Sequence, residues 1–317
     1  MSLRTPSLHV VFVVPWSVLL EWSTSLEECF LSKILPTITH HIHTALLFTW
    51  TDYKTIFIPV TAFACATGPV HSISSLLQAW VWIWLHLLLC NVSNQARSKD
   101  EDARNRPWRP LPSGRITELQ AVALRWTTVV VCLAYSSTYG RDLLVTTTGL
   151  GLVTFVYDDL GAASYVIGKN ICNVGGYAMF EIGATKIISA TSIMDPTSIT
   201  AVALSGTLIL TTIQAQDFPD VEGDRALGRM TFPIYAPELS RVVTIFATMT
   251  WSALLCWWWV VGPISTVAFV TFGTYVGLRY FVRRTVEEDK RSYLIFNAWL
   301  MFAHMLPLHA RMGVLSL

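Results

Sequence analysis

Two acidic stretches, residues 94–102 and 217–224, contain the side chains best suited to chemistry. On a helix, spacings of three and four residues would place Asp217, Asp220 and Asp224 within one narrow arc. Carboxylates this close need a cation. Mg2+ suits open carboxylate clusters, because it usually completes its coordination with water and phosphate oxygens. Two such stretches therefore predict a diphosphate site bridged by Mg2+.

The first stretch supports the same chemistry if the helix before it continues. Asn91, Asn94, Ser98, Glu101 and Asp102 would then lie within about a quarter of the helix circumference. Five oxygen-bearing side chains would face one way. The alternative is that they only cap and solvate a helix end, where serine, asparagine and aspartate are common. The residues alone leave both interpretations open.

The composition indicates a membrane protein. Hydrophobic residues make up 53% of the 317 residues and charged residues 14%, and the mean hydropathy is +0.49. These values exclude an ordinary water-soluble domain. The net charge is only +1, and the basic residues do not gather on a long polar surface, so nucleic acid is not an expected partner.

Nine segments are long and apolar enough to cross a bilayer. Their approximate limits are 44–66, 74–93, 118–138, 142–157, 171–191, 197–216, 241–261, 263–282 and 292–312. An earlier apolar run, residues 8–20, is too short to span and predicts a segment that is interfacial or packed against the bundle. We therefore expect an N-terminal segment, residues 1–43, and a transmembrane domain, residues 44–317.

Basic residues follow the second, fourth, sixth and eighth segments, whereas the opposite connections contain little beyond Arg141. This bias places the basic connections and both acidic stretches on the cytosolic side. Each acidic stretch follows an even-numbered segment, which predicts two pseudo-repeated four-helix halves and an added ninth helix. The basic residues are Arg97, Lys99, Arg104, Arg106, Arg109, Arg115, Lys169, Arg225, Arg229, Arg283, Arg284, Lys290 and Arg291.

Two long motifs carry a family resemblance. Residues 105–115 match N-x-P-W-R-P-L-P-S-G-R, and residues 217–233 match D-x-x-D-x-E-G-D-R-A-x-G-R-x-T-x-P. In this order they resemble the UbiA superfamily of intramembrane prenyltransferases, from about residue 44 onward. The resemblance implies an all-α, polytopic bundle of nine transmembrane helices and a Mg2+-dependent reaction of a prenyl diphosphate.

The family pattern N-x-x-x-D-x-x-x-D places Asn94 and Asp102 at its first and last positions, but Ser98 stands where the family has an aspartate. We hypothesise that Glu101, one helical turn away, supplies the missing oxygen. The second motif is matched without change. The predicted Mg2+ ligands are Asn94, Glu101, Asp102, Asp217, Asp220 and Asp224.

The resemblance also implies where the substrate binds: the diphosphate lies at the cytosolic mouth and the prenyl chain between the helices. Plain membrane-anchoring charge is the alternative role for each basic candidate. The predicted diphosphate-binding residues are Asn94, Arg109, Arg115, Lys169, Asn173 and Arg225. The predicted catalytic residues are Asp102, Asp220, Asp224 and Tyr157, the last because the family has a tyrosine near this position.

Aromatic side chains would stabilise the allylic cation without reacting with it. The segments expected to line the bundle contain Trp126, Tyr157, Tyr177, Phe180, Trp299 and Phe302. Most aromatic residues in membrane proteins instead form interfacial belts or pack between helices.

The acceptor of the cation decides the activity. The Asn94-Gln95 helix end, the Glu101-Asp102 pair and the residues 216–218 resemble a branch of fungal specialised metabolism that includes terpene cyclases. We favour cyclisation of farnesyl or geranylgeranyl diphosphate. Transfer to an aromatic acceptor is the main alternative, and a metal-gated transporter is a remote one. Expected partners are the substrate and lipid, with no obligate protein partner, in the endoplasmic reticulum membrane.

Overall fold

The structure, a computed structural model, describes residues 32, 34–191, 193–226 and 228–317, without the side chains of residues 101, 104 and 105. The predicted interfacial run, residues 8–20, lies outside this part of the chain. The chain divides into two compact units between Leu46 and Leu47. The described part of the first unit belongs mostly to helix α2, and the second unit, residues 47–317, contains the helical bundle.

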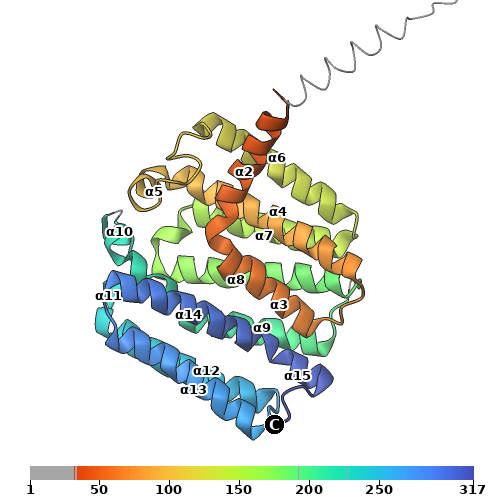
Figure 1. Cartoon of the computed structure of the whole chain (residues 1–317), viewed down its shortest axis with the longest axis vertical. Helices are drawn as coiled ribbons and strands as arrows, with labels where there is room; N and C mark the ends of the chain where they lie inside the picture. Colours follow the sequence, from red (N-terminus) through yellow and green to blue (C-terminus); the bar gives the residue numbers. More distant parts are fainter. Residues whose placement is uncertain (1–31, 33, 192, 227) are drawn as a thin grey trace, which may run out of the picture. The chain divides into compact units, whose positions relative to one another are not determined.

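The described residues are almost entirely helical, as predicted, and their β-structure is limited to an isolated bridge between Tyr165 and Met230 (Figure 1). The long helices are α4 (Ile73–Arg97), α6 (Glu118–Ser137), α7 (Arg141–Asp158), α8 (Val166–Ile188), α9 (Pro196–Thr212), α12 (Pro237–Trp258), α13 (Pro263–Val282) and α14 (Val286–Met305). The shorter elements are α2 (Leu35–Thr49), η2 (Trp50–Asp52), η3 (Tyr53–Phe57), α3 (Ile58–Thr67), α5 (Lys99–Asn105), η4 (Ala162–Ser164), η5 (Ile213–Gln216), η6 (Phe218–Asp220), α10 (Val221–Ala226), α11 (Phe232–Tyr235) and α15 (Pro307–Met312).

Among the described residues, four helical segments are long and apolar enough to cross a membrane by length and mean hydropathy. They are Ile73–Arg97, Glu118–Ser137, Pro196–Ala226 and Pro237–Trp258. The count of nine crossings therefore stays a prediction.

The first predicted segment, 44–66, is not one continuous helix. Helix α2 ends at Thr49, a 3-10 turn and a π turn follow, and α3 begins at Ile58. Pro59 lies at the first turn of α3, where its fixed φ is favourable and its missing N–H costs little. The irregular turns between the helices bring Asp52 and Thr55 to the wall of a cavity at the charged end of the bundle.

Two further boundaries differ from the prediction. The ninth segment was expected to run to residue 312, but α14 ends at Met305 and α15 begins at Pro307, because proline cannot continue the hydrogen-bond ladder. The sixth was expected to run to residue 216, but α9 ends at Thr212. There, the Gln214 side chain donates to the Thr211 carbonyl at 3.0 Å, and the chain tightens into a 3-10 turn.

Helix starts follow local capping chemistry. Ser72 accepts a hydrogen bond from the Ser75 backbone N–H before α4, and Thr117 accepts one from Gln120 before α6. In both cases the side chain of the third helical residue accepts a hydrogen bond from the backbone N–H of the cap residue, which completes a capping box. These caps satisfy backbone donors that the first helical turn leaves unpaired.

Small residues allow α12 and α13 to approach closely. Ser240, Thr244, Thr248 and Ser252 repeat every four residues along α12 and are fully buried. On α13, a Cβ atom added at Gly277 would lie 2.5 Å from the Cα of Ile245, which is backbone of the neighbouring helix. Such stripes of small residues are typical of helix pairs in membranes, because they let backbones pack directly.

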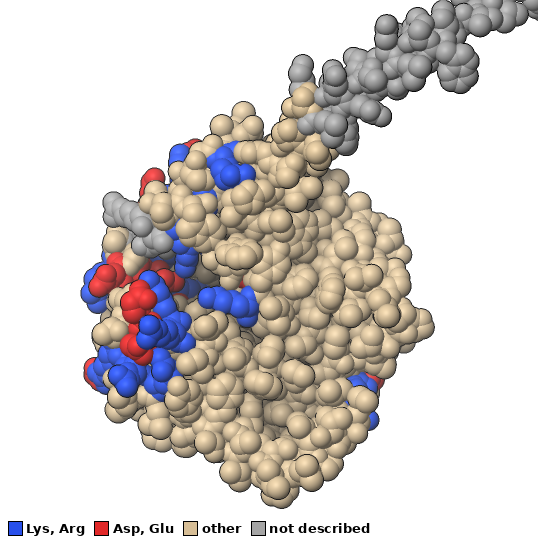
Figure 2. Space-filling model, viewed as in Figure 1, with Lys and Arg blue, Asp and Glu red and all other residues tan. Residues whose placement is uncertain are grey.

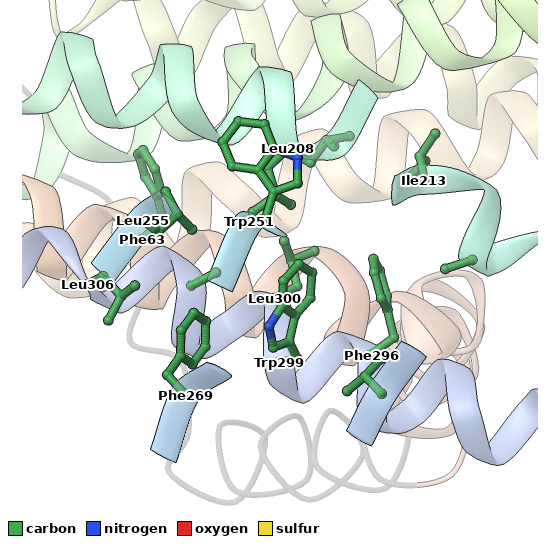
Figure 3. Packing of buried hydrophobic residues seen from close by; sticks show 14 of the residues in the cluster. Phe63, Leu208, Ile213, Trp251, Leu255, Phe269, Phe296, Trp299, Leu300 and Leu306 are labelled. Atoms are coloured by element: carbon green, nitrogen blue, oxygen red, sulfur yellow. The ribbon is translucent and has the colours of Figure 1, made fainter. Parts of the chain in front are cut away.

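The main apolar core lies between α9, α12, α13 and α14 (Figure 3). Trp299 is completely buried there and stacks on Phe269 with ring centroids 6.2 Å apart. Its indole N–H donates to Ser252 at 2.9 Å, so its polar atom is satisfied. A second cluster, which includes Trp82, Leu87 and Phe180, joins α3, α4, α7 and α8.

Charged side chains gather at one end of the bundle. Figure 2 shows Lys, Arg, Asp and Glu concentrated over the end that carries α5, α10 and α11 in Figure 1. The rest of this face is mostly uncharged, apart from a small group at the opposite edge. The distribution agrees with a bilayer around the uncharged belt and with basic connections on one side of it.

The close contact between α12 and α13 gives a stability prediction. We expect Gly277→Ala to destabilise the protein by about 1–3 kcal/mol, because the added methyl group can be accommodated only by a backbone shift. Gly151→Ala is the matched control: its Cβ meets no atom within 4 Å, and alanine is favoured by up to about 1 kcal/mol in a helix. Thermal unfolding in detergent would measure both. Equal stability of the two variants would contradict this account.

Candidate active site

A cavity of about 500 Å3 opens among the helix ends at the charged side of the bundle. Both acidic stretches reach it: its mouth is lined by Asn94, Asp102, Asp217, Asp220 and Asp224. Beyond these side chains the wall becomes apolar and is lined by Ile56, Leu87, Leu150, Val153 and Phe180. A polar mouth and an apolar interior suit a ligand with a charged head and a hydrocarbon chain.

The first acidic stretch is almost the continuous helix that was predicted, but the helix is interrupted at Ser98. Helix α4 ends at Arg97, and α5 continues after one non-helical residue. Ser98 occupies the position of the family aspartate, and its hydroxyl donates to Asp102 at 3.2 Å. Asn94 donates to Asp158 at 3.0 Å. Ser98 therefore orients Asp102, and the side chain of Glu101 lies outside the described part of the chain.

The loop after α5 places a positively charged side chain beside this stretch. One guanidinium nitrogen of Arg109 lies 2.7 and 2.9 Å from the two carboxylate oxygens of Asp102. Both side chains are buried, Asp102 at 1% exposure and Arg109 at 8%. From the same loop, Arg106 lies 3.6 Å from Asp220. This ion pair connects the two acidic stretches across the mouth.

The second acidic stretch surrounds Lys169, which projects from the first turn of α8. Its ammonium lies 2.6 Å from Asp217 and 3.9 Å from Asp224. Arg229 reaches the other oxygen of Asp224 at 3.3 Å. All four side chains are mostly shielded from solvent, so their charges interact more strongly than they would at an open surface.

Asp217, Asp220 and Asp224 do not lie on one α-helix, contrary to the prediction from their spacing. Asp217 precedes the 3-10 turn Phe218–Asp220, and α10 begins only at Val221. The carboxylates still reach one cavity. The 3-10 turn has about three residues per turn, so a spacing of three still keeps side chains on one side.

A buried ion pair packs against the 3-10 turn Phe218–Asp220. Arg241 of α12 donates to both oxygens of Asp289 of α14, at 3.0 and 2.8 Å. Its guanidinium also lies 4.5 Å from the ring centroid of Phe218, next to Asp217. Tyr280 completes the contact, because its hydroxyl donates to the Ala215 carbonyl at 3.1 Å. Residues from three helices thus fix the backbone on either side of Asp217.

Asp158 and its neighbour Asp159 face different partners. Asp158 lines the cavity and accepts the amide of Asn94. Asp159 pairs instead with Arg97 and Arg125, and the hydrogen bond from the Arg125 guanidinium holds the pKa of Asp159 below its usual value. Asp159 is therefore a structural anion that connects α4, α6 and the end of α7.

The structure separates the predicted diphosphate contacts into two groups. Asn94, Arg109, Lys169 and Asn173 line the cavity, and so does the predicted catalytic residue Tyr157. Arg115 and Arg225 are not among the residues that line it, and Arg225 is exposed. The predicted aromatic candidates divide similarly: Tyr157, Tyr177 and Phe180 line the cavity, Trp299 is buried in the core, and Trp126 and Phe302 are exposed.

Six charged residues of the cavity lining were not assigned to the site by sequence reasoning: Asp52, Lys54, Arg106, Asp158, Arg229 and Lys290. For Arg229 a signal was available. Gly228 has a positive φ of 68°, which only glycine adopts readily, and it ends the helical course of α10. The chain then turns back, so the Arg229 backbone N–H donates to the Asp224 carbonyl at 2.9 Å.

Several buried polar atoms at the mouth lack a hydrogen-bond partner within the described part of the chain. One oxygen of Asp224 is an acceptor of this kind. The donors are the side-chain amides of Asn91 and Asn173 and the Nε–H of Arg109. Buried polar groups without partners are rare in folded proteins and often mark a ligand. An unsatisfied carboxylate oxygen beside unsatisfied donors fits a cation bound together with an anion.

The carboxylates at the mouth are, however, not gathered into a compact cation cage. No cluster of three or more His, Cys, Asp or Glu ligands is found among the described residues. The arrangement instead alternates acids and bases around the cavity. It suits Mg2+ that reaches the site with an anionic ligand, because Mg2+ is usually held by one or two carboxylates and by phosphate oxygens.

Comparison with known proteins identifies the family. The model of the UbiA prenyltransferase family matches residues 56–305, so the chain belongs to this family and is an integral membrane enzyme of the terpene cyclase or prenyltransferase kind. The match includes both acidic stretches and the whole lining of the apolar part of the cavity.

Three similar proteins differ in their activities. The fumagillin beta-trans-bergamotene synthase of Aspergillus fumigatus is 28% identical over 272 residues, which cover 86% of this chain and 93% of that protein. A diterpene cyclase of Hericium erinaceus is 28% identical and covers 79% of this chain and 82% of its own length. A polyprenyl transferase of the same fungus is 26% identical, with coverage of 86% and 96%.

The fold also resembles solved structures. A UbiA homolog from Archaeoglobus fulgidus, solved with GPP and Mg2+ bound, superposes with a TM-score of 0.61 and covers 84% of this chain and 99% of its own. The two sequences are only 14% identical, so this likeness establishes the fold alone.

The anchor behind the second acidic stretch gives a testable prediction. We expect Arg241→Met to lower the free energy of unfolding by about 3–5 kcal/mol, because it leaves Asp289 buried without its counterion. Arg284→Met is the control, since Arg284 forms an exposed pair with Glu238, and it should cost less than about 1 kcal/mol. Chemical denaturation in detergent would compare them, and similar losses in both variants would argue against a special role for Arg241.

Proposed function

We propose that this protein is a Mg2+-dependent terpene cyclase that ionises farnesyl or geranylgeranyl diphosphate and closes the allylic cation on itself. The observation that carries the proposal is one cavity with acids and bases at its mouth and apolar side chains beyond them. The names of two similar proteins, a bergamotene synthase and a diterpene cyclase, support it.

The mouth would hold the diphosphate and its metal. The Mg2+ ligands would be Asn94, Asp102, Asp217, Asp220 and Asp224, with Glu101 as a further predicted ligand. When bound, Mg2+ supplies Lewis-acid stabilisation of negative charge on the diphosphate. The unsatisfied oxygen of Asp224 supports this assignment. GPP and Mg2+ are bound in the Archaeoglobus homolog, which supports the same combination here.

Basic and amide side chains of the mouth would bind the diphosphate oxygens. Lys169 and Arg109 are already held in place by Asp217 and Asp102, so little side-chain entropy is lost when an anion arrives. The unsatisfied amides of Asn91 and Asn173 would donate to further oxygens. Preorganised donors of this kind stabilise the charge that develops on the leaving group.

Ionisation separates charge along the cavity. The bond between C1 of the prenyl chain and the diphosphate oxygen breaks, and its electron pair leaves with the diphosphate toward Lys169. The allylic cation remains in the apolar part, where water is excluded and Tyr157, Tyr177 and Phe180 offer aromatic surface. Ring closure and transfer of a proton to the released diphosphate would then give a neutral hydrocarbon.

Two hydroxyl groups of the inner wall support cyclisation rather than transfer to a second substrate. The Thr154 hydroxyl donates to the Leu150 carbonyl at 2.9 Å, and the Tyr177 hydroxyl donates to the Thr55 carbonyl at 2.8 Å. These two hydroxyls already donate to backbone carbonyls, so they are not free to donate to a polar acceptor. Transfer to an aromatic acceptor remains the second candidate, because a similar chain is named a polyprenyl transferase.

The membrane arrangement belongs to the same proposal. We infer nine crossings, as two four-helix halves and a ninth helix, within a catalytic domain of residues 44–317. The cavity takes residues from α4 and α7 of the first half and from α8 and η6 of the second. The gathering of basic residues at the mouth supports an orientation toward the cytosol, in the endoplasmic reticulum membrane.

Purified protein incubated with Mg2+ and either farnesyl or geranylgeranyl diphosphate alone tests the activity. We expect release of inorganic diphosphate and a cyclic hydrocarbon detected by gas chromatography and mass spectrometry, and loss of both when EDTA removes the metal. Product formed only after a phenolic acceptor is added would favour the transferase instead. Absence of diphosphate release in both assays would refute either activity.

Two arginines of the second motif make a matched pair. Arg229→Ala should lower kcat/KM for the prenyl diphosphate by at least about 10-fold, because it removes a charge that contacts Asp224 at the mouth. Arg225→Ala, at an exposed position away from the cavity, should stay within about 2-fold, as expected of surface substitutions. The reverse order of the two effects would contradict the placement of the diphosphate.

A further inference from the structure

One face of helix α8 forms a continuous wall of the cavity from mouth to floor. Lys169, Asn173, Gly176 and Phe180 line it at spacings of three and four residues, which place them on one side of the helix, and Tyr177 lines it next to Gly176. From residue 169 to residue 180, eleven residues at 1.5 Å each span about 16 Å along the axis. The length of this wall therefore corresponds to the length of chain that can extend into the cavity from a charged group beside Lys169.

Gly176 lies in the middle of this wall and borders open space. A Cβ atom added there would meet no atom within 4 Å. Other glycines of α8 differ: a Cβ at Gly183 would lie 2.2 Å from Trp82, and one at Gly175 would lie 3.2 Å from Val153. Gly183 and Gly175 thus serve helix packing. Gly176 does not, and it is also absent from the glycines with positive φ.

The floor beyond Gly176 is fixed by packing. Phe180 is only 4% exposed and contacts Trp82 edge to face, with ring centroids 6.1 Å apart. Trp82 is completely buried and donates its indole N–H to Ser136 at 3.0 Å. Because Phe180 and Trp82 are packed in this way, they cannot easily move to make room for a longer ligand. The free volume beside Gly176 is therefore the part of the apolar cavity that a single side chain at this position would remove.

We propose that Gly176 determines which prenyl diphosphates the enzyme accepts. This inference rests on the proposed function. With the diphosphate at Lys169, the hydrocarbon chain passes Gly176 before it reaches Phe180, and the missing side chain leaves the space in which a long chain bends back on itself. A larger residue fills that space. The glycine thus selects chains that extend well beyond the first isoprene units, such as farnesyl and geranylgeranyl.

The test compares Gly176→Ala and Gly176→Leu with wild type in the presence of Mg2+. Diphosphate release is measured with geranyl, farnesyl and geranylgeranyl diphosphates, and binding of each is measured by thermal stabilisation. We expect Gly176→Leu to shift the ratio of geranylgeranyl to geranyl turnover by at least about 10-fold toward the shorter chain, since single methylene groups in apolar pockets have effects of this size. Gly176→Ala should shift it in the same direction by less.

Gly151→Leu is the matched control. Gly151 also has no atom within 4 Å of an added Cβ, but it is not among the residues that line the cavity. It should keep the wild-type ratio. Alanine is favoured over glycine in helices, so Gly176→Ala is expected to fold even if the leucine variant does not.

An unchanged chain-length ratio in Gly176→Ala and Gly176→Leu, with turnover retained, would overturn this inference and leave the proposed function intact. So would an equal shift in Gly151→Leu. If wild-type protein consumed none of the three diphosphates, the proposed function itself would fail and this inference with it.

Discussion

The structure depends on keeping several carboxylates and cations together at the mouth of an apolar cavity. A charged side chain buried away from water is costly unless it is paired and hydrogen-bonded. The protein meets this cost by direct pairing: Asp102 with Arg109, and Asp217 and Asp224 with Lys169. The pairs are buried, yet they leave an oxygen of Asp224 and the Nε–H of Arg109 unsatisfied. A metal diphosphate would satisfy both, so under the proposed function substrate binding would complete the electrostatic arrangement.

The rest of the bundle holds this mouth rigid while leaving space behind it. Close packing of α12 on α13 and the Arg241–Asp289 pair fix the second acidic stretch. Helix α8 carries Lys169 at one end of the cavity wall and Phe180 at the other, so under the proposed function it would contact both the head and the tail of a substrate. If the further inference holds, this one helix sets the distance between the charged end of a substrate and the far end of its chain.

Sequence alone predicted the helical class, most helix positions and both acidic stretches, because apolar periodicity and carboxylate spacing are local properties. Segment 263–282 coincides with α13. Irregular backbone was harder: the π turn before Pro59 and the 3-10 turn at Asp220 both contact α14, which is distant in sequence, and local patterns do not report such contacts. The ion pairs between side chains of the site were the hardest to predict. Arg225 and Arg229 belong to the same short motif, and only the turn at Gly228 brings Arg229 to Asp224.

The most direct test of the central claim is an experimental structure with Mn2+ and inorganic diphosphate bound, in which anomalous scattering locates the metal. We expect metal ions coordinated by carboxylates of both stretches, at Asp102 and at Asp220 or Asp224, with the diphosphate between them and in contact with Lys169. Metal bound to one stretch only, or diphosphate bound outside the cavity, would contradict the claim that the two stretches form one site.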